Sequence, residues 1–457
     1  MLKARLSLLY LLQFAVWGCY LTSLGQLLGG IGLGREISWF YAAVGIVSLV
    51  MPALAGYISD RYIQPRKLLT LMHLMAAICM SGLWGYLHTT PSPTFGVTFG
   101  LYVIFLSLYM PTIALANTTT FRTLSSRGED TLRDFPRIRI WGTVGFVLAM
   151  WLVNSLYWHD GVIGFTLSDA NEWGRYRMQY TSGQLLVSAL FGFLTSAYSL
   201  TLPNLDINHL YSTVKTGITG EDTLTDILGL NRFNLFRDRR LRSFLVFAIL
   251  AGVCLQISNG FVTPFITHFA ALSDYATNSV AANATMLFSI SQIAEAVCIL
   301  LVGISLRRFG IKIVLIIAML AWSIRFGCLA TGNPGNGLWL LIFSMVAYGV
   351  AFNYFNIAGA MYVDHTTYSG NKGFGQGVLM LMSNGVGATL GMFGAGAIVN
   401  RYCTWEPVMT SNGPVPYFMG DWSDVWWIFA GYSTLVALAI IFLFKPVDKN
   451  LSHTSNR

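Results

Sequence analysis

The chain has 457 residues, of which 54% are hydrophobic and only 11% are charged, and its mean hydropathy is positive. That much apolar surface cannot be buried inside one water-soluble core, so lipid must cover part of it. The net charge of +8 is typical of proteins that bind nucleic acid, but the placement of the basic residues, described below, argues against such a partner. The six cysteines show no metal-ligand spacing, and neither a zinc site nor a disulfide framework is expected.

Twelve apolar runs are long enough to cross about 30 Å of hydrocarbon, which takes roughly 20 helical residues. The first six runs are Leu6–Leu28, Ser38–Ile58, Leu68–His88, Val97–Thr119, Ile138–Trp158 and Gly183–Pro203. The other six are Arg242–His268, Ala281–Ile304, Ile311–Thr331, Leu338–Tyr362, Phe374–Val399 and Asp424–Lys445. Lipid cannot hydrogen-bond to backbone groups, so we predict an all-α membrane protein. The first run lacks a clean cleavage site and is expected to remain as an anchor.

The longest polar stretch, Asn204–Arg240, separates six runs from six. We therefore predict an N-terminal six-helix half at 1–203, a cytoplasmic linker at 204–241 and a C-terminal six-helix half at 242–457. A weak internal echo supports this division, because the Gly56–Tyr62 segment after the second run is similar to the Gly303–Phe309 segment after the eighth. Repeats in corresponding positions of two halves are typical of transporters.

The basic residues lie mostly on one side of the predicted membrane. If the amino terminus is cytoplasmic, the inside segments hold 23 of the 28 Lys and Arg residues. Only Arg35, Arg175, Arg177 and Arg401 then lie outside, and Arg325 lies within a run. This bias predicts that both termini are cytoplasmic, and it explains the positive charge as an insertion signal.

The loop between the second and third runs contains Gly56, Asp60, Arg61, Arg66 and Lys67. It resembles the signature loop of the major facilitator superfamily, whose members have two six-helix halves around a central cavity. Its charged side chains can bond a helix terminus or a neighbouring helix at the cytoplasmic face. An ordinary charged loop is the simpler alternative, but the twelve runs and the internal echo favour the signature.

Further motifs follow one another along most of the chain. They are Leu12-Gln-Phe14 with Trp17-Gly18, Tyr109-Met-Pro-Thr112, Asp134–Thr143, Leu255–Asn259, Ser289–Glu295 and Tyr348–Gly359. In this order they resemble the bacterial nucleoside:proton symporter family. The resemblance implies a nucleoside carrier of the bacterial inner membrane that needs no cofactor and takes nucleosides and protons as its partners. We expect a monomer within the lipid bilayer.

Two pairs of polar residues lie near the middle of the seventh and eighth runs. Gln256 and Asn259 are three residues apart, as are Gln292 and Glu295, so each pair shares one helix face. Polar groups at this depth normally face the bundle interior or a water-filled cavity. Amides and a carboxylate suit hydroxyls and the edge of a nucleobase. The alternative is that they bridge helices for a modest gain in stability.

Two further stripes combine rings with polar groups. Tyr348, Phe352 and Asn356 recur every four residues in the tenth run, and Arg139, Thr143 and Phe146 share a face in the fifth. Such stripes are usually packing, although rings can stack on a flat base. The resemblance implies that family positions for substrate binding fall on Arg139, Thr143, Phe146, Gln256, Asn259, Gln292, Glu295, Tyr348 and Phe352, and we add Asn353 and Asn356. We expect Arg325 to reach the outer interface and not the substrate.

The eleventh run is rich in glycine, at Gly375, Gly377, Gly385, Gly387, Gly391, Gly394 and Gly396. Small residues at such spacings let helices approach closely. Close packing is the expected role, and sliding between helices is the alternative.

The tenth run departs from the family that it resembles. The symporters commonly have an aspartate where this chain has Asn353. An amide cannot take up and release a proton near neutral pH, so Glu295 is the acidic group that remains deep in the runs. Either Glu295 alone couples the proton to the solute, or the protein only equilibrates its substrate. We favour coupling through Glu295.

The sequence thus predicts a secondary active transporter that takes up nucleosides by alternating access, driven by a proton gradient. The absence of a phosphate-binding Gly-x-x-x-x-Gly-Lys-Ser/Thr loop argues against a primary pump. An uncoupled facilitator, or a symporter of another polar solute such as a sugar, is the nearest alternative. A membrane-embedded enzyme would need clustered acid, base or metal-binding side chains, and the runs offer chiefly one carboxylate. A solute sensor would share the same pocket.

Overall fold

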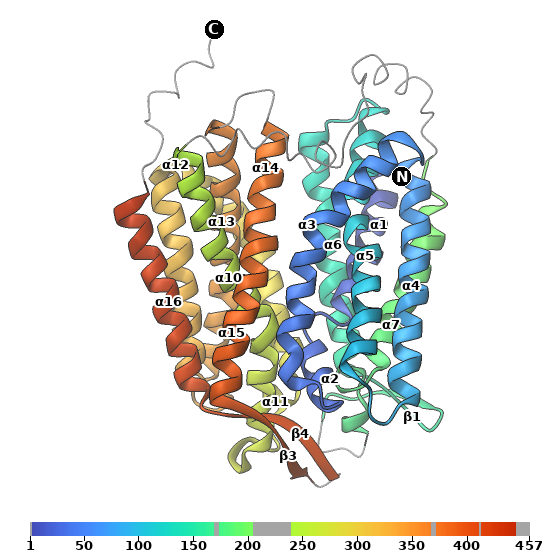
Figure 1. Ribbon diagram of the computed structural model, residues 1–457, viewed down its shortest axis with the longest axis vertical. Helices are drawn as coiled ribbons and strands as arrows, with labels where there is room; N and C mark the ends of the chain where they lie inside the picture. Colours follow the sequence, from blue (N-terminus) through green and yellow to red (C-terminus); the bar gives the residue numbers. More distant parts are fainter. Residues whose placement is uncertain (1, 169–172, 204–238, 367–371, 411–412, 445–457) are drawn as a thin grey trace.

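The computed structural model describes residues 2–168, 173–203, 239–366, 372–410 and 413–444, which are mainly helical (Figure 1). The helices before the polar stretch are α1 (Leu2–Gly18), α2 (Leu24–Gly30), α3 (Ile37–Arg61), α4 (Pro65–Thr89), α5 (Phe95–Ser125), α6 (Thr131–Ser155) and α7 (Gly183–Ser199). Those after it are α10 (Arg239–His268), α11 (Ser279–Ala282), α12 (Ala284–Thr331), α13 (Leu338–Thr366), α14 (Lys372–Met380), α15 (Ala388–Tyr402) and α16 (Trp422–Leu443). A π-helical segment, η8 (Leu381–Gly387), joins α14 to α15.

Nine helices of the described chain are long and apolar enough to cross a membrane. One of them, α12, covers both the eighth and the ninth predicted runs. Gly310 is its single break, with φ of 75° and ψ of 170°, so the two parts turn back on each other at one residue. Glycine suits this position because a β-carbon would be strained at positive φ.

The first predicted run, Leu6–Leu28, is wrong as a single helix. Helix α1 ends at Gly18, and α2 begins only at Leu24. Between them the chain turns, and the hydroxyl of Tyr41 on α3 donates to the carbonyl oxygen of Leu21. Hydropathy could not reveal this break, because the turn residues are buried among protein and lie within a run that is apolar on average.

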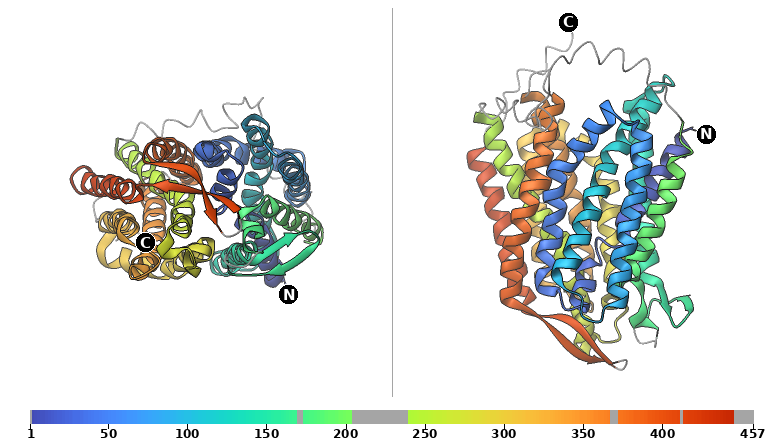
Figure 2. Two further views of the ribbon diagram at one scale, coloured as in Figure 1. Left: turned by 90° about the horizontal axis from the view of Figure 1, so that it is seen from below. Right: turned by 45° about the vertical axis from the view of Figure 1, so that its right-hand side comes forward.

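Figures 1 and 2 show the helices in two groups. The first group is α1–α7 and the second group is α10–α16. Two antiparallel hairpins, which hydropathy did not predict, lie at the end of the molecule opposite the start of α1. Strands β1 (Leu156–His159) and β2 (Val162–Phe165) belong to the first group, and β3 (Cys403–Thr410) and β4 (Gly413–Gly420) follow α15 in the second.

The hydrogen bonds that join the two groups gather at the hairpin end. The Asn283 carboxamide oxygen, at the end of α11, accepts from Asn154 Nδ2 at 2.7 Å and from Arg177 Nη1 at 2.8 Å. The carbonyl oxygen of Ala282 accepts from Arg177 Nη2 at 2.7 Å and from Gln179 Nε2 at 3.1 Å. Arg177 is fully buried in this cluster. The seam between the groups is therefore closed here by polar contacts.

The β3–β4 hairpin reaches across the same end of the seam, as the view from below in Figure 2 shows. Its Trp405 ring lies so close to the first group that a β-carbon on Gly29 would come within 2.1 Å of it, and one on Gly34 within 2.0 Å. Asn400 Nδ2, at the end of α15, donates to the carbonyl oxygen of Arg35 at 3.0 Å. Glycines at 29 and 34 thus make room for the hairpin.

At the other end, basic residues tie the first group together. Lys3 Nζ lies 2.8 Å from a carboxylate oxygen of Glu129 and 2.8 Å from one of Asp134, which joins α1 to the start of α6. In the signature loop, Arg66 Nη1 donates to the carbonyl oxygen of Leu202 at 2.5 Å, just beyond α7. Bonding to a neighbouring helix end is what the signature predicts. Gly56 has open space around it, and the side chains of Asp60 and Arg61 lie outside the described residues.

Glycines let η8 and α15 pack directly on α10 and α3. A β-carbon on Gly387 would come within 2.4 Å of the Ile249 carbonyl oxygen, and one on Gly391 within 2.7 Å of Val253 Cα. Gly385 and Gly396 meet side chains of α3 in the same way, whereas Gly377 and Gly394 face open space. Close packing is therefore confirmed for part of the stripe.

Candidate functional site

Helices α12 and α13 of the second group pack closely against each other. A β-carbon on Gly349 would lie 2.5 Å from the carbonyl group of Ala294, so glycine allows the backbones to meet. Asn353, one turn further along α13, donates from Nδ2 to the backbone carbonyl oxygen of Glu295 at 2.6 Å. Asn353 is buried, and its amide binds the main chain of the residue that we expect to carry the proton.

The predicted stripe on α13 forms a layer of rings. Tyr348 and Phe352 are stacked, with ring centroids 5.8 Å apart and planes within 3° of parallel. Trp322 of α12 meets Tyr348 edge-on at 5.7 Å. Asn356, the third member, donates from Nδ2 to the Phe352 carbonyl oxygen at 2.9 Å. Tyr348 is buried, whereas Phe352 and Asn356 remain partly exposed.

Arg325 does not reach an interface, so the expectation that it snorkels is wrong. Its side chain is fully buried, and Nη2 donates to the hydroxyl of Ser258 on α10 at 2.7 Å. Nη1 donates to the carbonyl oxygen of Ser344 on α13 at 2.7 Å, and the guanidinium lies 4.9 Å from the centroid of Tyr348. These bonds offset the cost of burying a charge. Arg325 thus connects α10, α12 and α13, and it contacts the ring layer at Tyr348.

In the first group, Arg139 lies on an aromatic surface of α1. Its guanidinium carbon is 4.0 Å from the centroid of Phe14 and 5.9 Å from that of Tyr10. Gly142 makes room for it, since a β-carbon there would come within 2.7 Å of Arg139 Nη1. The charges of Arg139 and Glu295 interact across the seam. Arg139 is therefore held against α1, and its charge acts on the second group through Glu295.

Phe146 lies on the same face of α6. It is buried and meets the Trp17 ring of α1 edge-on at 6.2 Å. Gly18 allows this approach, because a β-carbon there would lie 2.4 Å from the Phe146 carbonyl oxygen. Thr143 is partly exposed between Arg139 and Phe146. Trp17 is a neighbour that the sequence did not single out as a site residue, because one ring in an apolar run carries no functional signal.

The polar pairs of α10 and α12 differ in exposure. Gln256 is buried, whereas Asn259, Gln292 and Glu295 are partly exposed. The Gln292 side chain approaches the hydroxyl of Tyr348, which links α12 to the ring layer. Partly exposed amides and a carboxylate beside the rings leave hydrogen-bonding groups available to a solute.

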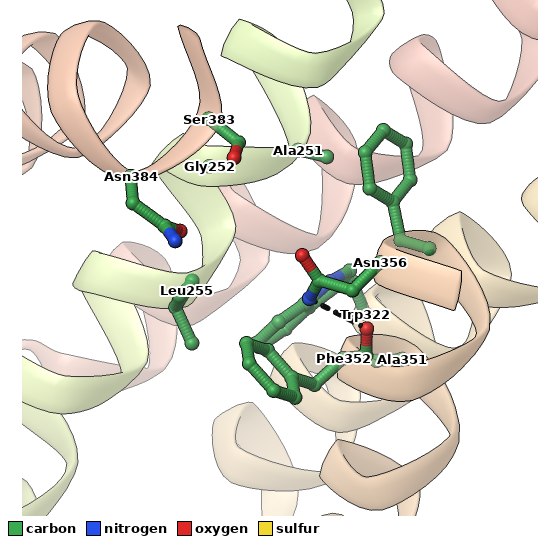
Figure 3. A pocket seen from close by; sticks show the side chains of 10 residues that line it. Ala251, Gly252, Leu255, Trp322, Ala351, Phe352, Asn356, Ser383 and Asn384 are labelled. Atoms are coloured by element: carbon green, nitrogen blue, oxygen red, sulfur yellow. Dashed lines mark hydrogen bonds between the residues drawn. The ribbon is translucent and has the colours of Figure 1, made fainter. Parts of the chain in front are cut away.

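A small pocket, partly open to solvent, lies on the second group (Figure 3). It is bounded by Leu255 of α10, Trp322 of α12, Phe352 and Asn356 of α13, and Ser383 and Asn384 of η8, among others. Phe352 and Asn356 were predicted, whereas Ser383 and Asn384 were not. An amide in the middle of an apolar run was the available signal at 384, the same signal that drew attention to Gln256.

The predicted residues therefore lie in three places. Asn356 and Phe352 line the pocket, Tyr348 and Asn353 are buried behind it, and Arg139 with Phe146 stands on the first group. The arrangement offers ring surfaces, neutral amides and one pair of opposite charges at a seam between two helix groups. Such a surface suits a flat polar solute.

Comparison with known proteins gives concordant matches over nearly the full length. A family model described as Nucleoside H+ symporter matches residues 1–449. Nucleoside permease NupG of Escherichia coli (strain K12) is 34% identical over 449 residues, which cover 97% of this chain and 96% of that protein. Xanthosine permease of the same organism is 34% identical over 444 residues, covering 96% and 95%. The crystal structure of nucleoside transporter NupG, 33% identical, superposes with a TM-score of 0.80 and covers 98% of this chain and 100% of that one. These matches confirm the resemblance carried by the motifs, and the chain belongs to the nucleoside:proton symporter family of membrane transporters.

Proposed function

We propose that this protein takes up nucleosides across the bacterial inner membrane by alternating access, driven by a proton gradient. The match of the family model to residues 1–449 carries the proposal, because it covers both helix groups and the seam between them. The relatives are permeases by name, and their lengths are covered almost completely.

The proposed architecture has twelve membrane spans in two six-helix halves, at 1–203 and 242–457, around a cytoplasmic linker at 204–241. Residues 204–238 of that linker lie outside the described residues. Both termini are placed in the cytoplasm on the distribution of basic residues. On that topology the hairpin end faces the outer side of the inner membrane, and the hydrogen bonds around Arg177 and Asn283, which close the seam there, support an inward-facing state. A monomeric state is part of the proposal.

The substrate is proposed to bind at the middle of the seam. Phe146 and Phe352 offer rings from opposite sides, and Gln256, Asn259 and Gln292 offer amides from α10 and α12. Binding of a solute between two rigid groups favours the state in which both groups contact it, which is the physical basis of alternating access.

Glu295 is proposed to carry the proton. Its charge interacts with that of Arg139 in the other group, so protonation of Glu295 weakens an attraction across the seam. Proton binding and the relative position of the groups are thereby linked, because the two protonation states favour the closed seam to different degrees.

An uncoupled facilitator is the second candidate, and Asn353 favours it. This residue donates to the Glu295 carbonyl oxygen and cannot exchange a proton near neutral pH. A single carboxyl group must then perform all of the coupling.

Uptake of radiolabelled nucleoside into proteoliposomes tests the proposal. We expect accumulation above the external concentration when the outside is acidic, and its collapse when an ionophore removes the gradient. Uptake that only equilibrates under either condition identifies a facilitator. Absence of nucleoside uptake, with glucose or another sugar transported instead, contradicts the proposal.

A further inference from the structure

The π-helical segment η8 places one amide in the pocket of Figure 3. Asn384 lies in the middle of the seven-residue segment Leu381–Gly387, and its side chain points into the space in front of Asn356 and Phe352. π-Helical turns are rare and are frequent at functional sites, because the extra residue shifts the side chains relative to a regular helix. The sequence alone gives no indication of this turn.

Packing fixes the position from which Asn384 projects. A β-carbon on Gly252 would lie 2.0 Å from the Ser383 carbonyl oxygen, so α10 and η8 are in direct backbone contact. On the other side, a β-carbon on Gly45 of α3 would lie 3.2 Å from the Asn384 carbonyl oxygen. The backbone at Asn384 is thus held between the two helix groups, and the side chain is presented from a fixed support.

The polar atoms of the pocket are few, and most are already bonded. Ser383 Oγ donates to the Leu379 carbonyl oxygen at 3.0 Å, and Asn356 Nδ2 donates to the Phe352 carbonyl oxygen. Within the described chain, the Asn384 side chain has no hydrogen-bond partner, and it is only partly buried. Its donor and acceptor, together with the Asn356 carboxamide oxygen, remain available to a ligand.

The rest of the wall is apolar and aromatic, from Leu255, Trp322 and Phe352 among others. A ribose carries several hydroxyls and would leave them without partners here, at a cost for each. A nucleobase presents flat faces to rings and a donor–acceptor edge to an amide, which asparagine pairs with through both of its atoms. The flat apolar wall and the amide edge of the pocket therefore fit the base better than the sugar.

We infer that Asn384 is a specificity-determining residue that reads the hydrogen-bonding edge of the nucleobase from the π-helical turn. The inference rests on the proposed function and adds a base-reading position to it. The amides and the carboxylate of α10 and α12 are then left for the ribose.

Adenosine and inosine are the discriminating probes. They share the same ribose, but adenosine has an amino group and an acceptor nitrogen where inosine has a carbonyl oxygen and an N–H. Both should be measured as competitors of radiolabelled uridine uptake, and by calorimetric binding to purified protein. Their 2′-deoxy analogues report on recognition of the sugar.

We expect Asn384→Ala to change the ratio of adenosine to inosine affinities by roughly fivefold or more, since a lost hydrogen bond to a buried polar edge has an effect of this order. Asn384→Asp, which keeps the volume but replaces the amide donor, should also change the ratio. The penalty for a missing 2′-hydroxyl should stay the same in both variants. Met380→Ala, an exposed residue just before η8, is the matched control and should keep both ratios.

The outcomes separate the inference from the proposed function. If wild-type protein transports nucleosides and both folded Asn384 variants keep the adenosine to inosine ratio, the inference is wrong and the function stands. If the variants change only the loss of affinity caused by removing the 2′-hydroxyl, Asn384 contacts the sugar, and the inference that it recognises the base is wrong. If wild-type protein neither binds nor transports any nucleoside, the proposed function itself fails.

Discussion

The two helix groups hold their candidate site residues in different ways. In the second group, Tyr348 is supported by Arg325, whose donors are bonded to Ser258 and Ser344. In the first group, Arg139 lies on the ring of Phe14, and its charge interacts with that of Glu295 in the second group. One arginine is hydrogen-bonded within its own group, whereas the other stacks on a ring and its charge acts on the opposite group. A buried arginine in a membrane helix can therefore serve either the scaffold or the ligand, and its partners decide which.

Replacing each arginine gives the largest expected contrast. Arg325→Ala leaves a cavity and removes the donors to Ser344 and Ser258, so we expect it to lower the free energy of unfolding by about 3–5 kcal/mol. Arg139→Ala, the matched variant, should keep thermal stability close to wild type while abolishing nucleoside uptake. Thermal unfolding of both purified variants in detergent measures the first effect. Equal losses of stability would break the distinction between the two arginines.

The next effect concerns coupling between the groups. Glu295→Gln keeps the shape of the side chain but cannot release a proton, so accumulation driven by a pH gradient should be lost while exchange of nucleoside persists. Asn353→Asp is its counterpart. An ionised aspartate cannot donate to the Glu295 carbonyl oxygen, so Asp at 353 must hold a proton to keep this bond, which adds a second exchangeable proton.

Both variants are compared with wild type in proteoliposomes at an imposed pH gradient. Concentrative uptake that survives in Glu295→Gln rules out the glutamate as the sole proton carrier. Equal accumulation by wild type and Asn353→Asp would show that position 353 has no part in coupling.

A smaller effect is expected at the ring layer of the second group. Phe352→Ala should weaken nucleoside binding by about 1–3 kcal/mol, which is the range for stacking of a base on an aromatic side chain. Phe343→Ala on the same helix, where the ring is half exposed on the outer surface, is the control and should bind normally. Calorimetric titration of folded protein gives the comparison. Unchanged affinity in Phe352→Ala would exclude the stacking role.

The smallest effects are expected for the amides of α10 and α12. Gln256→Leu and Gln292→Leu keep the volume but remove donors and acceptors, and each should weaken binding by about 1 kcal/mol. Uptake at low nucleoside concentration should fall, while the amount of protein in the membrane fraction and its gel-filtration profile in detergent should stay unchanged. Normal transport by both variants would identify these glutamines as bridges between helices.

Much of the helical architecture could be predicted from the sequence, because length and hydropathy alone locate a membrane helix. The runs Ser38–Ile58 and Leu68–His88 lie within α3 and α4. The break between α1 and α2 could not be predicted, because the turn between them is buried in protein and its residues continue an apolar run. The boundary between the eighth and ninth runs was placed correctly, because the non-helical Gly310 lies between Ile304 and Ile311.

The candidate site was predictable where residue spacing determines which side chains share a helix face. Tyr348, Phe352 and Asn356 could be placed on one stripe in this way. The partners of Arg325 could not, because Ser258 is 67 residues away along the chain and its hydroxyl has many possible acceptors and donors. Asn384 could not be recognised as a site residue, because the glycines around it indicated close packing. The π-helical turn depends on tertiary contacts that the sequence does not reveal.

The carbonyl oxygen of Ala282, at the hairpin end of the seam, accepts hydrogen bonds from Arg177, Gln179 and Tyr180. This oxygen belongs to the main chain at the end of α11, so replacing the Ala282 side chain does not remove the acceptor. The donors, by contrast, are side chains and can be lost one at a time. In a saturation mutagenesis screen for growth on nucleosides, small residues at 282 should therefore be tolerated, while changes at Arg177 should be depleted.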